Sequence, residues 1–208
     1  MNRTWLLMVI PILACFMVAD LAAGLDTSPK QVLIEARVIE LGLKVGYLNF
    51  TEIEDIDNTI GFGLTVGKNI LPNIKLEGNV DYWTKSQDEQ HDNYKTEWSY
   101  DDLFLGATFY YLFPAMWRSC LSPEFGWIRP FVGLGGGAHI IGWDWKQGYN
   151  GDSFQESGSD TKFGFHGTGG IQMDLAPSWN GGLEFRYTDA HDMDNWGIFA
   201  KVNYLIEY

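Results

Sequence analysis

Cysteine, basic side chains and long hydrophobic runs are all scarce in this chain of 208 residues. Of its two cysteines, Cys15 lies in an N-terminal segment that we expect to be removed, so only Cys120 remains and an intramolecular disulfide is excluded. Only 14 lysines and arginines accompany 27 aspartates and glutamates, and the formal charge of −13 argues against nucleic acid as a partner. Beyond the N-terminal segment there is no run of about 20 apolar residues, which excludes a helical membrane protein.

The N-terminal residues are organised like a signal peptide. Arg3 precedes an uncharged run at 5–19, and small residues end the segment at Gly24. The run is short for a transmembrane helix, although an uncleaved anchor is the alternative. The predicted organisation is a cleaved signal peptide at 1–24, a periplasmic segment at 25–38 and one folded domain at 39–208.

The end of the chain alternates between apolar and polar residues, which is the pattern of a β-strand. One face carries Trp196, Ile198, Ala200, Val202, Tyr204, Ile206 and Tyr208. The opposite face carries Gly197, Lys201, Asn203 and Glu207, and Phe199 and Leu205 are exceptions. A final strand that ends on an aromatic residue resembles the closing strand of a bacterial outer-membrane β-barrel.

Seven earlier segments alternate in the same way, so the sequence predicts eight antiparallel strands in all. The earlier strands are predicted at 39–47, 60–67, 74–82, 103–113, 127–141, 162–174 and 179–188. Short turns are expected at 71–73 and 176–178, longer polar loops at 49–58, 85–97, 144–160 and 189–194, and a long connection at 114–126. Ten strand residues at about 3.3 Å each, tilted by about 40°, span roughly the 25 Å apolar band of an outer-membrane barrel.

The polar face distinguishes a membrane barrel from a soluble ligand-binding barrel, which would carry its charges outside. This face is rich in glycine and has both signs of charge, and a lysine or arginine facing lipid would cost about 2–4 kcal/mol. We therefore predict an all-β fold, an eight-stranded antiparallel transmembrane β-barrel with a polar, glycine-rich, filled lumen. The predicted lumen network is Glu40, Lys44, Lys75, Glu77, Asp81, Lys162, His166, Asp174, Glu184, Arg186, Lys201 and Glu207. Glu40 and Glu184 are the candidate partners of Lys201, because their strands flank the last one.

Aromatic residues gather at the ends of the predicted strands. One rim carries Tyr47, Tyr82, Tyr187 and Trp196, and the other carries Tyr111, Phe113, Trp127, Trp179, Tyr204 and Tyr208. Aromatic girdles of this kind mark the two membrane interfaces of a barrel, and we favour that interpretation over a sugar-binding surface.

Three segments, at 41–47, 127–137 and 182–188, resemble strands of the small outer-membrane β-barrel family of the OmpA/OmpX type. The resemblance covers nearly the whole chain after the signal peptide. It implies a cell outer membrane location, contact with outer-membrane lipid and lipopolysaccharide, and recognition of the C-terminal strand by the barrel-assembly machinery. The family includes anchors and adhesins, so the resemblance specifies the architecture more closely than the function.

The sequence gives little evidence for a catalytic or metal-binding site. His166 with Glu184 and Thr168 could form a catalytic cluster, but the serine–histidine pattern of lipid-A-modifying barrels is missing, so we expect no enzyme activity, no cofactor and no metal site. The acidic loops lack the ligand spacing of a dedicated calcium site. We predict a monomer without an open pore that binds a surface ligand through acidic extracellular loops. A narrow pore and a lipid-A-modifying enzyme are the alternatives.

Overall fold

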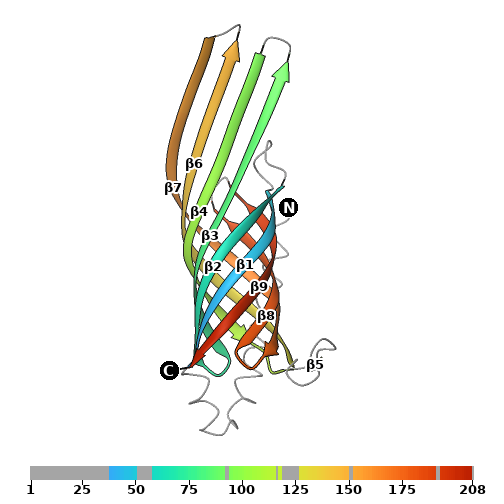
Figure 1. Cartoon of the computed structure of the whole chain (residues 1–208). Helices are drawn as coiled ribbons and strands as arrows, with labels where there is room; N and C mark the ends of the chain where they lie inside the picture. The colour runs from blue at the N-terminus through green and yellow to red at the C-terminus, as the bar shows by residue number, and fades with distance from the viewer. Residues whose placement is uncertain are drawn as a thin grey trace, which may run out of the picture.

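The computed structural model describes residues 38–50, 58–91, 94–115, 117–118, 127–149, 152–190 and 193–207. Their regular structure is all strand, and eight strands close into an antiparallel ring in which β1 pairs with β9 and β4 with β6 (Figure 1). The predicted eight-stranded barrel is confirmed. The strands are β1 (Val38–Phe50), β2 (Asn58–Leu71), β3 (Ile74–His91), β4 (Tyr94–Leu112), β6 (Trp127–Tyr149), β7 (Asp152–Ala176), β8 (Trp179–Asp189) and β9 (Asn195–Glu207).

A ninth strand, β5 (Trp117–Arg118), lies outside the ring and pairs only with the start of β6. It falls in the predicted connection 114–126, most of which lies outside the described residues. The predicted signal peptide, the segment 25–37, Tyr208 and the side chain of Trp127 lie outside them as well. No helix in the described part of the chain is long and apolar enough to cross a membrane.

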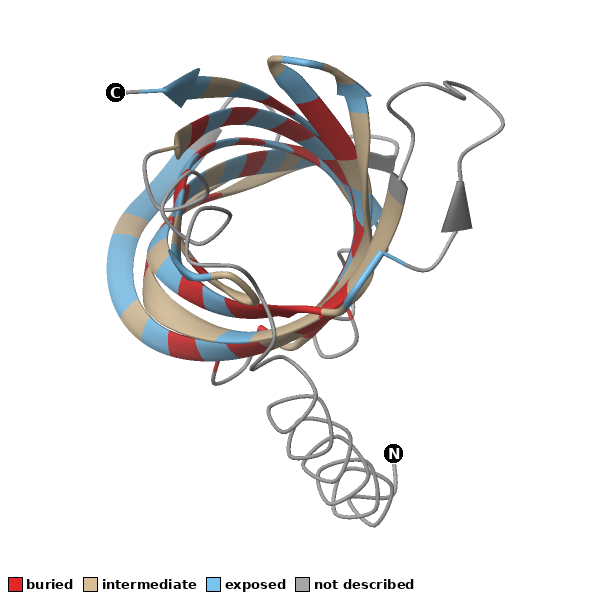
Figure 2. Ribbon diagram, turned by 90° about the horizontal axis from the view of Figure 1, so that it is seen from below, coloured by how far each residue is buried: buried red, intermediate tan, exposed pale blue. Residues whose placement is uncertain are grey.

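The strands alternate between buried and exposed residues, as the banding of the ring in Figure 2 shows. In β1, Gly42 and Lys44 are buried inside the ring whereas Leu43 is 66% exposed on its outer surface. The outward apolar residues reach 78% exposure at Phe163. Charged groups therefore lie inside and apolar groups outside, which is the reverse of a soluble barrel.

The predicted loops at 85–97 and 144–160 are wrong, because most of these residues are in strands. β3 and β4 continue far above the ring, and so do β6 and β7, as two long hairpins (Figure 1). The hairpins pair with each other through β4 and β6 up to Tyr94 and Tyr149, so their backbone groups are satisfied in spite of the polar sequence. The part of these strands at 85–91, 94–100, 143–149 and 152–158 is called the projecting sheet below.

Glycine makes room for the side chains inside the ring. A Cβ at Gly63 would collide with the side chains of both Lys44 and Asp81, which form an ion pair beside it. Gly78, which points outwards, has no atom closer than 3.9 Å to the position of a Cβ. The crowding is thus specific to the inner surface.

Candidate functional site

A continuous chain of opposite charges runs through the interior of the ring. Its members alternate in sign, in the order Glu40, Lys75, Glu77, Lys201, Glu184, Arg186, Asp81 and Lys44. Successive nitrogen and oxygen atoms are 2.5–3.3 Å apart. The chain links β1, β3, β8 and β9, so it ties opposite walls of the barrel together, and each buried charge lies against at least one of opposite sign.

Lys201 is the central cation of this chain. Its Nζ lies 2.6 Å from Glu77 and 3.3 Å from Glu184. Glu184 is one of the two carboxylates that the sequence suggested as partners, whereas Glu40 pairs with Lys75 at 2.5 Å instead. The contact with Glu77 crosses the lumen from β9 to β3, so adjacency of strands in the sheet does not predict it.

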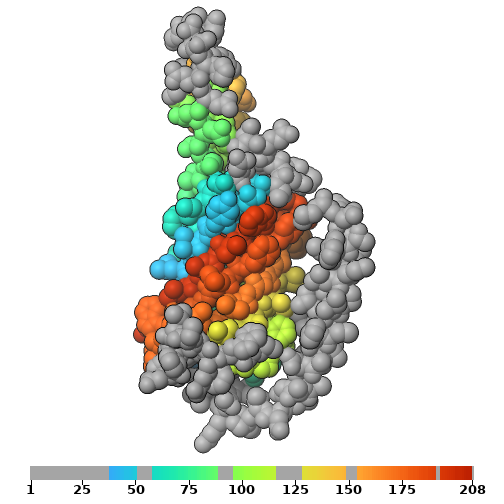
Figure 3. All heavy atoms as spheres, turned by 90° about the vertical axis from the view of Figure 1, so that its right-hand side faces the viewer, coloured from blue at the N-terminus to red at the C-terminus, as the bar shows by residue number. Residues whose placement is uncertain are grey.

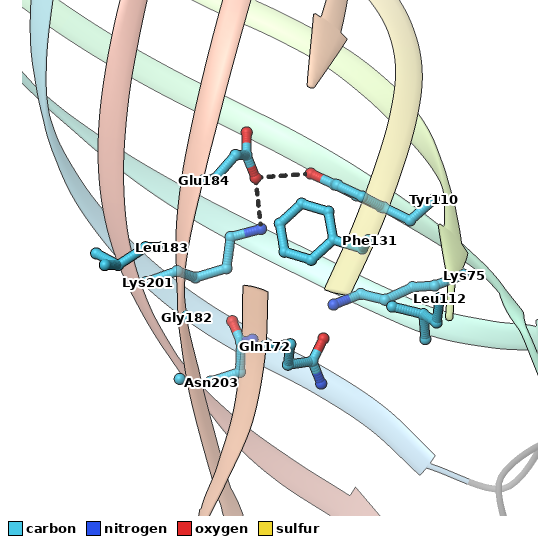
Figure 4. A pocket seen from close by; sticks show the side chains of 11 residues that line it. Lys75, Tyr110, Leu112, Phe131, Gln172, Gly182, Leu183, Glu184, Lys201 and Asn203 are labelled. Atoms are coloured by element: carbon cyan, nitrogen blue, oxygen red, sulfur yellow. Dashed lines mark hydrogen bonds and ion pairs between the residues drawn. The ribbon is translucent and has the colours of Figure 1, made fainter. Parts of the chain in front are cut away.

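Tyr110 joins the two central carboxylates and was missed by the sequence prediction. Its hydroxyl lies 3.2 Å from Glu77 and 3.0 Å from Glu184, and Figure 4 shows it beside Lys201. The ring is 3% exposed and packs edge-on against Phe131 at 5.3 Å. The alternation of β4 does put Tyr110 on the inner face, but two apolar neighbours, Phe109 and Tyr111, conceal it in the sequence.

Four predicted lumen residues do not join the chain of charges. His166 is buried, and its Nε2 lies 2.8 Å from Thr108 Oγ1 rather than beside Glu184. Lys162 and Asp174 are partly exposed towards the two ends of the barrel. Glu207 is exposed because it lies at the last described position of β9, beyond the crowded interior.

The upper part of the interior contains an apolar cluster, which the sequence prediction of a polar lumen did not include. The cluster is buried and is formed by Leu48, Phe50, Trp83, Ile141, Ala190, Met193 and Phe199. Phe199, an exception to the predicted face of the last strand, points inwards and lies 5.2 Å from both Lys44 and Arg186, measured to the ring centroid. Another pair, Asp102 and His139, lies nearby with 2.8 Å between Oδ2 and Nδ1.

The predicted girdle residues divide by exposure. Tyr47, Tyr82, Trp179 and Tyr204 are 42–46% exposed on the outer surface, and Tyr187 and Trp196 are partly exposed. The ring of Trp196 lies 6.2 Å from that of Tyr47, and the ring of Trp179 lies 5.0 Å from that of Tyr204. Tyr111 is only 7% exposed, with its ring 5.1 Å from that of the partly buried Phe113, so it is not part of an exposed girdle.

The family model for the outer membrane protein beta-barrel domain matches residues 12–204, which is nearly the whole sequence. The chain belongs to the outer membrane protein beta-barrel family. Its place is accordingly the outer membrane, with the exposed apolar side chains of the ring facing lipid. The search of curated proteins gave no match.

The comparison with solved structures found bacterial outer-membrane proteins at low sequence identity. OprG of Pseudomonas aeruginosa superimposes with a TM-score of 0.51 at 11% identity, over 84% of this chain and 98% of that one. Neisserial surface protein A gives a TM-score of 0.49 at 13% identity, over 80% and 96%. Ail of Yersinia pestis gives 0.47 at 14% identity, over 81% and 98%. At these identities the likeness to OprG shows the fold alone.

Apart from the chain of charges in the barrel, a second cluster of candidate functional side chains lies on the projecting sheet, and it is aromatic. Trp98 and Tyr100 of β4 face Trp145 and Trp143 of β6 in register, on the surface that continues the inside of the barrel. None of these aromatic residues was a predicted site residue, because their segments were predicted to be loops. Among the described residues no group of three or more histidine, cysteine, aspartate or glutamate side chains is arranged to hold a metal ion.

Proposed function

We propose that the protein is a surface-interaction protein, in which the barrel is a filled anchor and the projecting sheet, on the extracellular side, makes the interaction. The observation that carries this proposal is the extension of four strands far beyond the ring, as a continuous hydrogen-bonded sheet (Figure 1). A sheet of this kind presents side chains in fixed positions, as binding surfaces require. The acidic residues predicted in loops, such as Asp88 and Glu156, lie on it.

The filling of the barrel favours an anchor over a pore. The cavities described inside the ring have volumes of about 20 Å³ and 30 Å³, and a cavity needs about 10–15 Å³ to hold one water molecule. The lower cavity lies beside Tyr110, Lys201 and Glu184, which cross the lumen (Figure 4). Eight-stranded barrels in general have interiors that side chains fill.

The buried histidines also favour a role without catalysis. His166 contacts Thr108 and His139 contacts Asp102, and both residues lie inside the barrel, at most 5% exposed. A lipid substrate outside the ring would have no access to them. We therefore propose that the protein is not an enzyme, that it works as a monomer, and that lipopolysaccharide is its lipid environment rather than its substrate.

Shortening the projecting sheet along its own register tests this function. Lys85 pairs with Tyr100, and Trp143 pairs with Gly158, so 86–99 and 144–157 can each be replaced by a two-residue Asn-Gly turn. Two bacterial strains are compared, one producing the full protein and the other the shortened protein, with equal amounts of protein in the outer membrane. Attachment is measured to a layer of cultured cells and to bare plastic. We expect the shortened protein to insert and to remain heat-modifiable in gels, but to reduce attachment to the level of cells without the gene. Equal attachment by both would contradict the proposal.

A further inference from the structure

An aromatic hollow lies on the projecting sheet, outside the chain of charges in the barrel. Trp98 is directly opposite Trp145, and Tyr100 is directly opposite Trp143, so four aromatic side chains form a compact block across β4 and β6. Together with Asp144 and Glu156 they line a hollow of about 540 Å³. This volume is within the range of about 300–1,000 Å³ for small-molecule sites.

The rings of the hollow are held in place by their neighbours. Trp98 and Tyr100 pack against the buried apolar cluster of the barrel and lie edge to face, with 5.5 Å between their centroids. Trp145 lies edge to face with Phe154 at 5.9 Å. Gly158 is opposite Trp143, and a Cβ there would approach the indole to 2.5 Å, so glycine leaves the space that the indole occupies. All four rings of the block stay partly exposed, which leaves aromatic surface for a ligand.

The charge of the lining selects the ligand. Glu156 contributes a carboxylate, whereas the side chain of Asp144 points to the opposite face of β6, where its Oδ2 accepts a hydrogen bond from Gln155 Nε2 at 2.9 Å. The residues that line the hollow include no lysine or arginine. The nearest described cation on this face, Lys85, is opposite Tyr100, but its Nζ donates to the backbone carbonyl of Asn58 at 3.0 Å. Phosphate, sulfate and carboxylate groups are therefore disfavoured in the hollow, and a positive group is favoured.

We propose that the aromatic hollow binds an organic cation with a quaternary ammonium group, such as a choline headgroup. This inference rests on the proposed function and names the chemistry of its ligand. The face of an indole attracts a cation, tryptophan does so more strongly than other aromatic side chains, and aromatic cages are a known device for binding quaternary ammonium. A quaternary ammonium has methyl groups to pack against the rings and no N–H group that needs a hydrogen-bond partner. The carboxylate of Glu156, exposed beside Trp145, adds a countercharge.

Equilibrium dialysis with labelled choline tests the proposal on the full protein in a maltoside detergent, which has no ammonium group. The neutral molecule 3,3-dimethylbutan-1-ol has the shape of choline and is used as a competitor. We expect saturable binding of choline, and competition that needs at least about tenfold more of the neutral molecule. A second arm replaces free choline with vesicles of phosphatidylcholine or phosphatidylglycerol, which tells a lipid headgroup from a free cation.

Variants separate attraction by the ring from simple apolar contact. Trp145→Leu keeps an apolar side chain and removes the aromatic face, so choline binding should fall about tenfold, whereas Trp145→Phe should retain part of it. Glu156→Gln should weaken binding severalfold. Ser99→Ala is the matched control, because Ser99 lies between Trp98 and Tyr100 on the opposite face of β4, and it should leave binding unchanged.

Three results would overturn the proposal: absence of saturable binding, equal binding of choline and its neutral analogue, or binding of neutral oligosaccharides but not of choline. The last result would identify a glycan site instead. Any of these could occur while shortening the projecting sheet still abolished attachment, and the proposed function would then stand without this ligand. If shortening had no effect on attachment but choline bound as expected, the hollow would be a ligand site without an adhesive role.

Discussion

Lys44 of β1 and Lys201 of β9 lie directly opposite each other at the seam where the barrel closes. Figure 3 shows the two strands side by side. Like charges in this position repel and destabilise a strand pair. The structure offsets the repulsion by directing Lys44 to Asp81 and Lys201 to Glu77 and Glu184. Closure of the ring therefore depends on carboxylates from other strands.

Replacing Lys201 by methionine should permit insertion but destabilise the barrel. Glu77 would lose its contact at 2.6 Å and Glu184 its contact at 3.3 Å, and both are at most 1% exposed. Removing one partner of a buried ion pair costs about 3–5 kcal/mol. Urea unfolding of the protein in lipid vesicles measures the loss. Lys146→Met on the exposed projecting sheet is the control and should cost about 1 kcal/mol or less. Equal losses in the two variants would show that the interior ion pairs do not stabilise the fold.

Tyr110→Phe should lower stability without changing the packing of the ring. The hydroxyl lies between Glu77 and Glu184, and a hydrogen bond to a charged group contributes about 1.5–3 kcal/mol. Tyr82→Phe, on the exposed outer surface, is the matched control. The thermal unfolding midpoint, followed by gel shift, should fall for the first variant only. A larger fall for the control would mean that Tyr110 is not a structural link.

Gly63→Ala should destabilise the barrel although alanine is a small residue. The new Cβ would collide with Lys44 and Asp81 and force their ion pair apart, and overpacking of this kind costs about 1–3 kcal/mol. Gly78→Ala points outwards into open space and should be neutral or stabilising. Unfolding free energies of the two variants give the comparison, and the same value for both would contradict the inward crowding.

Deleting 204–208 should prevent insertion. Tyr204 pairs with Leu41 on β1 and with Trp179 on β8, so the deletion leaves backbone groups of both neighbours unpaired at the edge of the membrane. Each unsatisfied group in lipid costs several kcal/mol, and the truncated chain should be degraded before assembly. Cell fractionation followed by immunoblotting measures insertion. A band of the truncated chain in the outer-membrane fraction would contradict the prediction.

Local alternation predicted the ring well because each strand must place one face towards lipid and one towards the interior. It predicted the turn at Pro72 and the inward position of Lys44 from neighbouring residues alone. The alternation failed where a strand depends on pairing with a segment far away in the sequence. The strands around Trp98 and Trp145 resembled loops in composition, and only their pairing with each other makes them a sheet. The contact between Lys201 and Glu77 was also missed, because it depends on the width of the closed barrel.

Conductance through a planar lipid bilayer tests the central claim, a lumen filled by charge pairs and an apolar cluster, most directly. Purified protein should give no steady channel current at either polarity, because Lys201, Glu77 and Tyr110 cross the interior in contact with one another. The shortened protein without the projecting sheet should be equally silent. A steady, reproducible ionic conductance from the purified full chain, scaling with the amount inserted, would contradict the filled lumen and favour a pore.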